Sequence, residues 1–274
     1  MPANDQYALG RTQREYARLA RQSAIFAPLT QRLFEDAGIT PGMRVLDLGS
    51  GAGDVCMMLA RMVGPQGNVI GLDHDAAAVE HARERAAADG FTNIEYVACD
   101  FADYNPADHV DAIVGRFVLL YQTDPAAALA AVIRHLRPGG IAAFQELWMQ
   151  PAKGPDSNIM RAASCVVETM RRSGAHLDAG PRLARIFTAA GLPVPRMRCE
   201  QLMDAHPGSP LFQYFADTLE SLLPKAIEYG IATEGEFDLE TLPVRIEAEL
   251  QTVGYPMLSA PNVLAWCRSC GAIR

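Results

Sequence analysis

Three acidic residues, Asp47, Asp73 and Asp100, each stand in or just after a short apolar run of the sequence. A carboxylate such as that of Asp73, at the end of a strand, can accept hydrogen bonds from both hydroxyls of a ribose. Asp100 can accept a hydrogen bond from the amino group of adenine, and the ring of Phe101 can pack on the base. Each acid alone is more typical of a turn or a helix cap. Three acids at successive strand ends indicate a ligand site, because ligands bind at that edge of an open α/β sheet.

A glycine turn lies between the first two acids, in the stretch MRVLDLGSGAGD from Met43 to Asp54. A strand, a glycine turn and a helix together present backbone N–H groups to a ligand, and glycines let the ligand approach closely. The spacing is G-x-G-x-G, and Asp54 stands where a dinucleotide turn has its third glycine. The Gly-Lys-Ser/Thr of a phosphate-binding loop is absent. A tight turn without a ligand remains the alternative interpretation.

Apolar runs alternate with helical patterns from Thr40 onward, which predicts an α/β fold with parallel strands. Helix start and stop signals separate them: Asp124-Pro125 begins one helix, and Pro138-Gly139-Gly140 is expected to end it. The predicted strands are 44–49, 68–73, 93–100, one within 110–121, 141–147, 194–202 and 262–270. The predicted helices are 11–26, 54–63, 75–90, 125–137, 156–173, 181–190, 210–229 and 239–251.

The runs VLDLGSGAGD, GLDHD, ACDF, VGRFVLLY and LRPGGIAAFQE, in this order, resemble the class I S-adenosylmethionine-dependent methyltransferases. The resemblance is to their small-molecule group, of the type 11/25-like kind. It is clear over residues 40–147 and looser over 181–202 and 262–270. It implies a Rossmann-like, doubly wound sheet of seven strands whose last strand is antiparallel, to which this sequence adds a helical lid.

The resemblance implies S-adenosylmethionine as the cofactor, and it places nine residues against it. Gly49, Ser50 and Gly51 would line its methionyl and ribose parts. The other six are Asp47 at the amino end, Asp73 with His74 beside it at the ribose, Asp100 and Phe101 at the adenine, and Arg116 near the sulfonium.

Methyl transfer requires alignment of the reactants and exclusion of water, so the sequence should supply a cover and, for a hydroxyl acceptor, a base. Glu146, at the end of a predicted strand, and His176, in the following loop, are candidate bases. Tyr7 is a candidate aromatic partner of the sulfonium. Arg11, Arg14, Arg18 and Arg21 form a basic stripe on the first helix, for which a solvated face is the expected role.

The sequence predicts five segments. These are an N-terminal helical cover (1–38), a cofactor-binding core (39–150), an extra helix with the remaining core helix and strand (151–203), an acidic helical lid (204–260) and a final core strand (261–274). The lid carries ten acids between Asp204 and Pro256 against Lys225 and Arg245, which equals the formal net charge of −8 for the whole chain. The lid could steer a cationic acceptor toward the site, although solvation explains its charge equally well.

The composition of the chain argues against several classes of binding partner. An acidic chain without a basic face is unsuited to nucleic acid, and no apolar run is long enough to span a membrane. Most of the six cysteines lie in apolar runs and no secretion signal is visible, so we expect reduced thiols and a cytoplasmic protein. Cys267 and Cys270 have a metal-like spacing but no second pair, so we predict no metal site. The sequence is compatible with association of the chain into a homo-oligomer.

The acceptor is expected to be a small molecule, because the motifs of base-modifying methyltransferases are absent. The Asn/Asp-Pro-Pro-Tyr run of amino-methyltransferases does not follow the fourth strand, and the sequence contains no Pro-Cys dipeptide. Arsenite methylation, which uses several cysteines, stays open through Cys165 and Cys199. Two other functions also remain: a protein that binds the cofactor without methylating, and a nicotinamide-dependent oxidoreductase, which the acid in the glycine turn disfavours.

Overall fold

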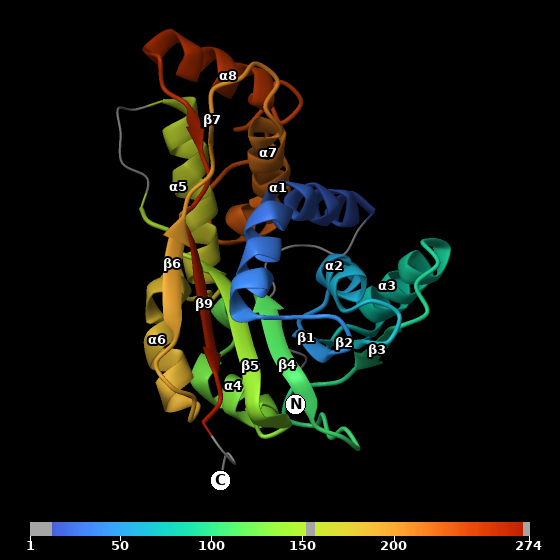
Figure 1. The fold of residues 1–274 in the computed structure, drawn as a ribbon. Coiled ribbons are helices and arrows are strands. Elements are labelled where there is room, and N and C mark those ends of the chain that lie inside the picture. The colour runs from blue at the N-terminus through green and yellow to red at the C-terminus, as the bar shows by residue number, and fades with distance from the viewer. Residues whose placement is uncertain (1–12, 152–156, 271–274) are drawn as a thin grey trace.

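The structure is a computed structural model that describes residues 13–151 and 157–270, and it is built on a sheet of seven strands (Figure 1). The strand order is β3-β2-β1-β4-β5-β9-β6. The strands are β1 (Arg44–Leu48), β2 (Asn68–Asp73), β3 (Ile94–Ala98), β4 (Val110–Arg116), β5 (Leu136–Leu147), β6 (Arg196–Glu200) and β9 (Asn262–Arg268). The last strand, β9, lies antiparallel between β5 and β6. The predicted Rossmann-like, doubly wound sheet with an antiparallel last strand is therefore confirmed.

Helices cover both faces of this sheet because its strands carry apolar residues on both sides. In β1, Val45 packs on one face with α1 (Gln13–Ala37), α2 (Asp54–Val63) and α3 (Ala76–Ala88). Leu46 and Leu48 pack on the other face with α4 (Pro125–Ile133) and α6 (Ala179–Ala189). Strands buried on both faces are typical of parallel sheets.

A third layer of helices lies beyond the carboxyl ends of the parallel strands (Figure 1). It consists of α5 (Asn158–Arg172), α7 (Pro210–Glu228) and α8 (Leu242–Val253), with a small hairpin of β7 (Met203–Asp204) and β8 (Met257–Leu258). These elements share an apolar core that includes Cys165, Leu219 and Ile246. We call this layer the lid.

The first helix is longer than predicted, because it continues to Ala37 instead of ending near residue 26. Pro28 removes one backbone hydrogen bond from its interior. Leu29, Leu33 and Phe34, which follow Pro28, are buried against the sheet. Burial of each such side chain stabilises the folded protein by roughly 1.5–3 kcal/mol. Packing therefore outweighs the local signal to stop.

The Pro138-Gly139-Gly140 run also differs from its prediction, because it lies inside β5 and not at the end of a helix. The helix before it, α4, already ends at Ile133. The strand begins at Leu136, which pairs with Val110, and the register then shifts before Ala112. Gly139 has a φ of 74°, which lets the strand bulge and continue.

The six cysteines carry free thiols, and Cys56 and Cys165 are buried. Within residues 13–151 and 157–270, no group of three or more His, Cys, Asp or Glu side chains could hold a metal ion. Among the helices in these two ranges, none combines the length and the apolar character needed to cross a bilayer.

Candidate functional site

A cavity of about 1720 Å³ lies between the carboxyl edge of the sheet and the lid. All nine residues predicted to contact the cofactor line this cavity, although they come from four strand ends that are far apart in the sequence. They are Asp47, Gly49, Ser50, Gly51, Asp73, His74, Asp100, Phe101 and Arg116. Parallel strands end at one edge of the sheet, which explains why these residues meet.

The glycine turn has the geometry that a bound ligand requires. A Cβ on Gly49 would come within 2.5 Å of Val118, so only glycine fits there. A Cβ on Gly51 would have no neighbour nearer than 4.0 Å, which means that the turn faces open space. Between them, the Ser50 hydroxyl oxygen is buried and has no hydrogen-bond partner among the described residues. An unsatisfied buried hydroxyl in a cavity wall is suited to a ligand.

Asp73 is held in place from two sides. Its Oδ2 accepts a hydrogen bond from the Gly51 amide at 2.9 Å, and its Oδ1 accepts one from the Asp75 amide at 3.0 Å. The His74 ring nitrogen Nδ1 lies 3.3 Å from Oδ1. Burial raises the pKa of Asp73, but these hydrogen bonds outweigh it and bring the pKa below its usual value of 3.8. The carboxylate is therefore ionised near neutral pH.

Asp47 and Arg116 supply opposite charges to the same part of the cavity. Asp47 is almost completely buried, and burial raises its pKa from 3.8 to about 7, although a hydrogen bond from Cys56 and the charge of Arg116 oppose this. The Cys56 sulfur donates to Asp47 Oδ2 at 3.1 Å. Burial lowers the pKa of Arg116, whose guanidinium donates to the hydroxyls of Ser23 and Thr30, at 3.2 and 3.4 Å.

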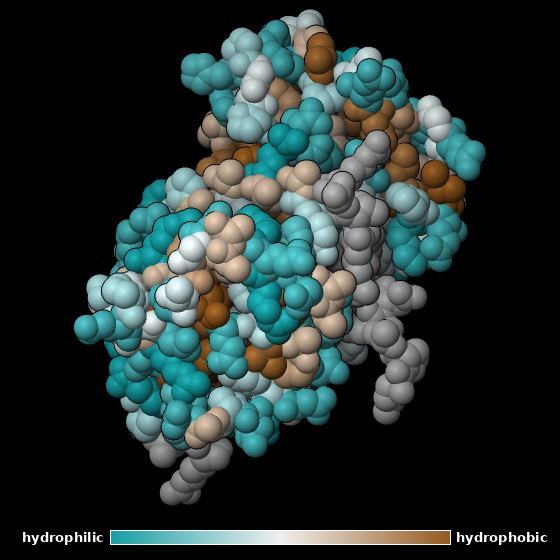
Figure 2. Space-filling model, turned by 90° about the vertical axis from the view of Figure 1, so that its right-hand side faces the viewer, coloured by the Kyte–Doolittle hydropathy of each residue, from teal (hydrophilic) through white to brown (hydrophobic). Residues whose placement is uncertain are grey.

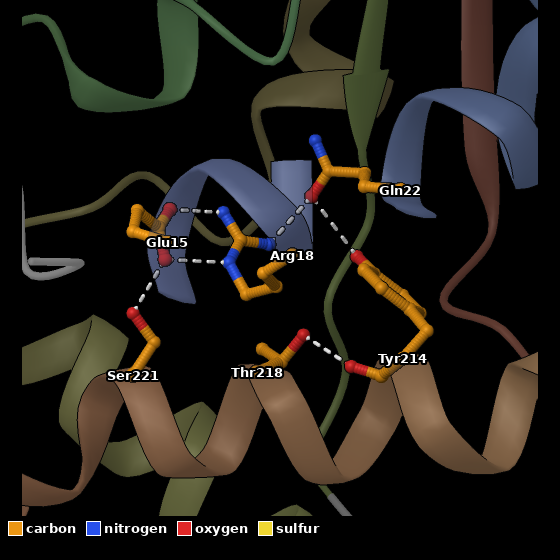
Figure 3. A network of polar contacts seen from close by, with 6 residues as sticks. All are labelled: Glu15, Arg18, Gln22, Tyr214, Thr218 and Ser221. Atoms are coloured by element: carbon orange, nitrogen blue, oxygen red, sulfur yellow. Dashed lines mark hydrogen bonds and ion pairs between the residues drawn. The ribbon is translucent and has the colours of Figure 1, made fainter. Parts of the chain in front are cut away.

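A buried polar network joins α1 to α7 at the wall of the cavity (Figure 3). Arg18 donates twice to Glu15, at 2.6 and 2.8 Å, and once to Gln22 at 2.8 Å. From α7, Ser221 donates to Glu15 at 2.7 Å, and the Tyr214 hydroxyl donates to Gln22 at 3.3 Å. The network fixes the position of α1 against the lid.

This network corrects the prediction of a solvated basic stripe. Arg18 is buried, whereas Arg21 is exposed and forms an ion pair with Asp217 of α7. Arg11 lies outside the described residues. The spacing of Glu15 and Arg18, three residues apart on a helix, was the signal in the sequence that they pair. No local signal pointed to Gln22 or Tyr214.

Of the three candidate catalytic residues, the two that the structure describes both lie outside the cavity wall. Glu146 is fully buried outside the cavity wall, and it accepts hydrogen bonds from the amides of Val118 and Leu119 at 3.0 and 2.7 Å. Burial raises the pKa of Glu146 to about 8. His176 also lies outside the wall, with its Nε2 2.9 Å from the carbonyl oxygen of Gln122. Tyr7 lies outside the described residues.

Phe117 follows the predicted Arg116 and has an unusual backbone. Its φ is 56°, which makes it the one non-glycine residue with positive φ in the described parts of the chain. Its ring lines the cavity and meets Phe26 of α1 edge to face, with 5.6 Å between the ring centroids. A bulky residue in this conformation is strained and is often found at functional sites.

Several proteins that this chain resembles are methyltransferases, which agrees with a cavity lined by a glycine turn and acids at strand ends. A family model described as a methyltransferase domain matches residues 39–191. The arsenite methyltransferase of Halobacterium salinarum is 36% identical over 121 residues, which are 44% of this chain and 31% of that protein. The ubiquinone/menaquinone biosynthesis C-methyltransferase UbiE of Vibrio campbellii is 35% identical over 130 residues, 47% of this chain and 50% of that protein. The chain thus spans half or less of the length of these relatives.

The fold comparison extends beyond the matched core. A crystal structure of a candidate methyltransferase from Bacillus halodurans C-125 superposes with a TM-score of 0.60 at 16% identity. The match covers 88% of this chain and 98% of that one, so the likeness of fold includes most of the elements outside the family model. The family model itself covers more than half of the chain, and the chain belongs to the methyltransferase-domain family of class I S-adenosylmethionine-dependent enzymes.

Proposed function

We propose that this protein transfers the methyl group of S-adenosylmethionine to a small-molecule acceptor bound between the sheet and the lid. The observation that carries the proposal is the meeting of Asp47, Asp73 and Asp100 around the glycine turn in one cavity. The Ser50 hydroxyl, buried and without a hydrogen-bond partner in the described part of the chain, and the open space over Gly51 fit a cofactor bound against that turn.

Each end of the cofactor has a chemically matched partner in this arrangement. Asp73, ionised and fixed by two backbone amides, accepts hydrogen bonds from the ribose hydroxyls. Asp47 binds the α-ammonium group of the methionyl part, and the buried guanidinium of Arg116 binds its carboxylate. Asp100 and Phe101 contact the adenine.

Burial away from water is unfavourable for charged side chains, which supports the assignment of Asp47 and Arg116. The pKa of Asp47 is raised and that of Arg116 is lowered, so both side chains are poorly solvated in the protein alone. A zwitterionic group between them would supply one opposite charge to each side chain. Binding would then restore the ionised form of Asp47.

When bound, the cofactor supplies a methyl group on a positively charged sulfur, which is already a good leaving group. The protein's residues have the remaining tasks of aligning the acceptor and excluding water. The α1–α7 network closes one wall of the cavity, and Phe26, Phe117 and Tyr214 bring aromatic rings close together there. Aromatic faces can stabilise a sulfonium by cation–π attraction.

The role of a base stays a prediction for Glu146, His176 and Tyr7. The position of Glu146 favours a positioning role. Its carboxyl group accepts hydrogen bonds from the amides of Val118, a cavity residue and the N-cap of the short helix η1 (Leu119–Tyr121), and of Leu119. A carboxyl held in this way sets the path of the cavity wall without touching the reactants.

A small molecule is the acceptor class that the cavity favours. Binding pockets for small ligands usually measure about 300–1,000 Å³, so a cavity of about 1720 Å³ has room for the cofactor and a second compound. Of the two reported relatives, one is named for arsenite and the other for the biosynthesis of ubiquinone and menaquinone. The presence of cysteines does not favour arsenite here, because Cys165 and Cys199 do not line the cavity.

Two measurements test the proposal. Calorimetry with S-adenosylmethionine, S-adenosylhomocysteine and NAD⁺ should show binding of the first two alone. Incubation with methyl-labelled cofactor and a panel of metabolites should then give a product heavier by one methyl group. Binding of NAD⁺ alone would overturn the proposal. Cofactor binding without turnover on any acceptor would favour the non-methylating alternative.

A further inference from the structure

The lid side of the cavity differs in character from the sheet side. The sheet contributes carboxylates, a guanidinium and backbone amides, whereas α5 contributes apolar side chains and its N-cap Ser157. The apolar residues from α5 are Ile159, Met160, Ala163, Val166, Val167 and Met170. We call the part of the cavity between α5, α7 and β8 the apolar chamber.

The opposite walls of the chamber are also mainly apolar. From α7 come Leu211, Phe215 and Leu222, and from the C-terminal end of the lid come Leu250 and Met257. The polar side chains that α7 adds are Tyr214 and Thr218, both of which take part in the network shown in Figure 3. Trp148 and Met149, which follow β5, complete the apolar lining.

The acidic charge of the lid lies elsewhere. Of the ten acids between residues 204 and 256, all of which are described, Glu249 alone lines the cavity. Asp217 pairs with Arg21, Glu228 with Lys225 and Glu236 with Arg161, all on the outside of the chamber wall. The charge of the lid is therefore mostly solvated or paired, and it does not create a pocket for a cation.

The cavity opens to solvent through an apolar rim. Val253, Tyr255 and Leu258 line the cavity, yet 57%, 69% and 48% of their surfaces are exposed. Figure 2 shows more hydrophobic surface on the upper lobe, which the lid forms, than on the lower lobe. An exposed apolar rim around a concave site is typical of a binding site for an apolar ligand.

From these features we infer that the acceptor is an uncharged molecule with a bulky apolar body, which lies in the apolar chamber, and a small polar reactive end. This inference rests on the proposed methyl transfer and names the substrate class for the same site. Burying a charge in the chamber would be costly, because neither α5 nor α7 presents a charged side chain to it, and Glu249 of α8 is the one acid from residues 204–256 on the cavity wall. Burying apolar surface there is favourable at about 25 cal/mol per Å².

The polar end of the acceptor would lie where the apolar chamber borders on the polar side chains of Gln22 and Tyr214. Gln22 and Tyr214 line the cavity where α1 crosses α7, next to Phe26 and Phe117. Gln22 Oε1 accepts hydrogen bonds from Arg18 and Tyr214, while its Nε2 has no partner among the described residues (Figure 3). That amide nitrogen is available to donate to an oxygen or nitrogen of the acceptor.

Equilibrium binding of simple probes tests the inference without requiring catalysis. The full chain, saturated with S-adenosylhomocysteine, is titrated with the neutral fluorophore N-phenyl-1-naphthylamine, which is then displaced by hexanol, octanol and decanol. Each added CH₂ should tighten binding about three- to fourfold if the chain enters an apolar site. Octylammonium, which carries a positive charge, should bind at least tenfold more weakly than octanol.

Matched variants locate the probe site. Ala163→Phe fills the chamber from α5, and Ser164→Phe places the same ring on the exposed side of the same helix. We expect Ala163→Phe to weaken probe binding at least tenfold and Ser164→Phe to leave it unchanged. Val167→Phe, on the next turn of the chamber wall, repeats the test if Ala163→Phe does not fold. Calorimetry with S-adenosylhomocysteine on each variant should give the wild-type affinity.

The outcomes are distinguishable. Tightening with chain length that Ala163→Phe or Val167→Phe abolishes supports the inference. Three results would overturn the inference. The affinity of the alcohols could be independent of their chain length, both chamber variants could leave probe binding intact, or octylammonium could bind more tightly than octanol. If the cofactor product binds normally in these cases, the proposed function stands while the acceptor class is wrong. Failure of the wild-type chain to bind the cofactor product would instead refute the proposed function.

Discussion

The Asp73 carboxylate and the Gly51 amide are joined by a hydrogen bond of 2.9 Å, which ties the end of β2 to the glycine turn after β1. The other carboxylate oxygen is held by the amide of Asp75. The side chain proposed to bind the ribose is thus oriented before any ligand arrives, and little conformational entropy remains to be lost on binding.

Asp73→Ala should weaken S-adenosylmethionine binding by about 1–3 kcal/mol, the usual cost of leaving buried polar groups unpaired. Calorimetry measures this directly. Asp124→Ala is a suitable control, because the Asp124 carboxylate also accepts hydrogen bonds from two backbone amides, at the N-terminus of α4, but lies outside the cavity wall. The control should lower thermal stability without changing the affinity. An unchanged dissociation constant for Asp73→Ala would mean that the ribose assignment is wrong.

Ser50→Ala should weaken cofactor binding without lowering the thermal stability of the ligand-free protein. The Ser50 hydroxyl is buried without a partner among the described residues, so its removal should leave the melting temperature of the ligand-free protein unchanged or slightly raised. If the hydroxyl binds the cofactor, the same change should weaken that binding by about 0.5–1.5 kcal/mol. Loss of stability with full affinity would contradict the proposed contact.

The affinity for S-adenosylmethionine should fall as the pH decreases through about 7. The pKa of Asp47 is raised to about 7 by burial, so the carboxylate proposed to bind the cofactor's ammonium group is increasingly protonated below this pH. Each unit below it should weaken binding up to tenfold. Asp47→Asn should bind weakly and lose this dependence. A wild-type affinity that is constant between pH 5.5 and 8.5 would argue against the pairing.

Glu146 should make the protein less stable as the pH rises. Its pKa is about 8 in the folded protein, above the usual 4.5 of this side chain, so the folded state keeps a proton that the unfolded chain releases. Between these two values, the free energy of unfolding should fall by up to about 1.4 kcal/mol per pH unit. Urea denaturation of the wild type and of Glu146→Gln across this range measures how the free energy of unfolding changes with pH. The contribution of Glu146 to this pH dependence should be absent from the variant and, in the wild type, should disappear below pH 4.

Arg18 and Arg21 allow a comparison of a buried ion pair with an exposed one on the same helix. Arg18→Met removes the two hydrogen bonds that hold the buried Glu15 and should cost about 3 kcal/mol of folding free energy. Arg21→Met breaks an exposed pair with Asp217 and should cost less than about 1 kcal/mol. Chemical denaturation of both variants gives the comparison. Equal losses would show that the buried pair contributes no more to folding than the exposed one.

The nature of the fold and of the cofactor end of the site follows from local signals. The glycine turn, the apolar runs and the acids after them depend on residues that are close in the sequence. Once the strands are recognised as parallel, Asp47, Asp73 and Asp100 must lie at one edge of the sheet. The strand boundary at Pro138-Gly139-Gly140 was wrong because a bulge and a turn use the same residues.

The lid side of the site depends on contacts between distant segments. The burial of Arg18 requires α7, whose Ser221 reaches Glu15 across 206 positions, and the hydroxyl of Tyr214 reaches Gln22 across 192. The burial of Glu146 under the amides of Val118 and Leu119 likewise could not be foreseen from the sequence around it.

The sequence alone therefore determined the sheet, the glycine turn and the acids at the carboxyl edge of the sheet, because hydrophobic period, turn chemistry and strand direction are local properties. Only the tertiary structure decided which helix closes the cavity and which of the lid's faces is turned inward. Burial is a property of the packed chain, and the same acidic segment could have presented charges or apolar side chains to the acceptor. In the folded protein, its acids, except Glu249, lie outside the cavity wall and its apolar side chains form the chamber.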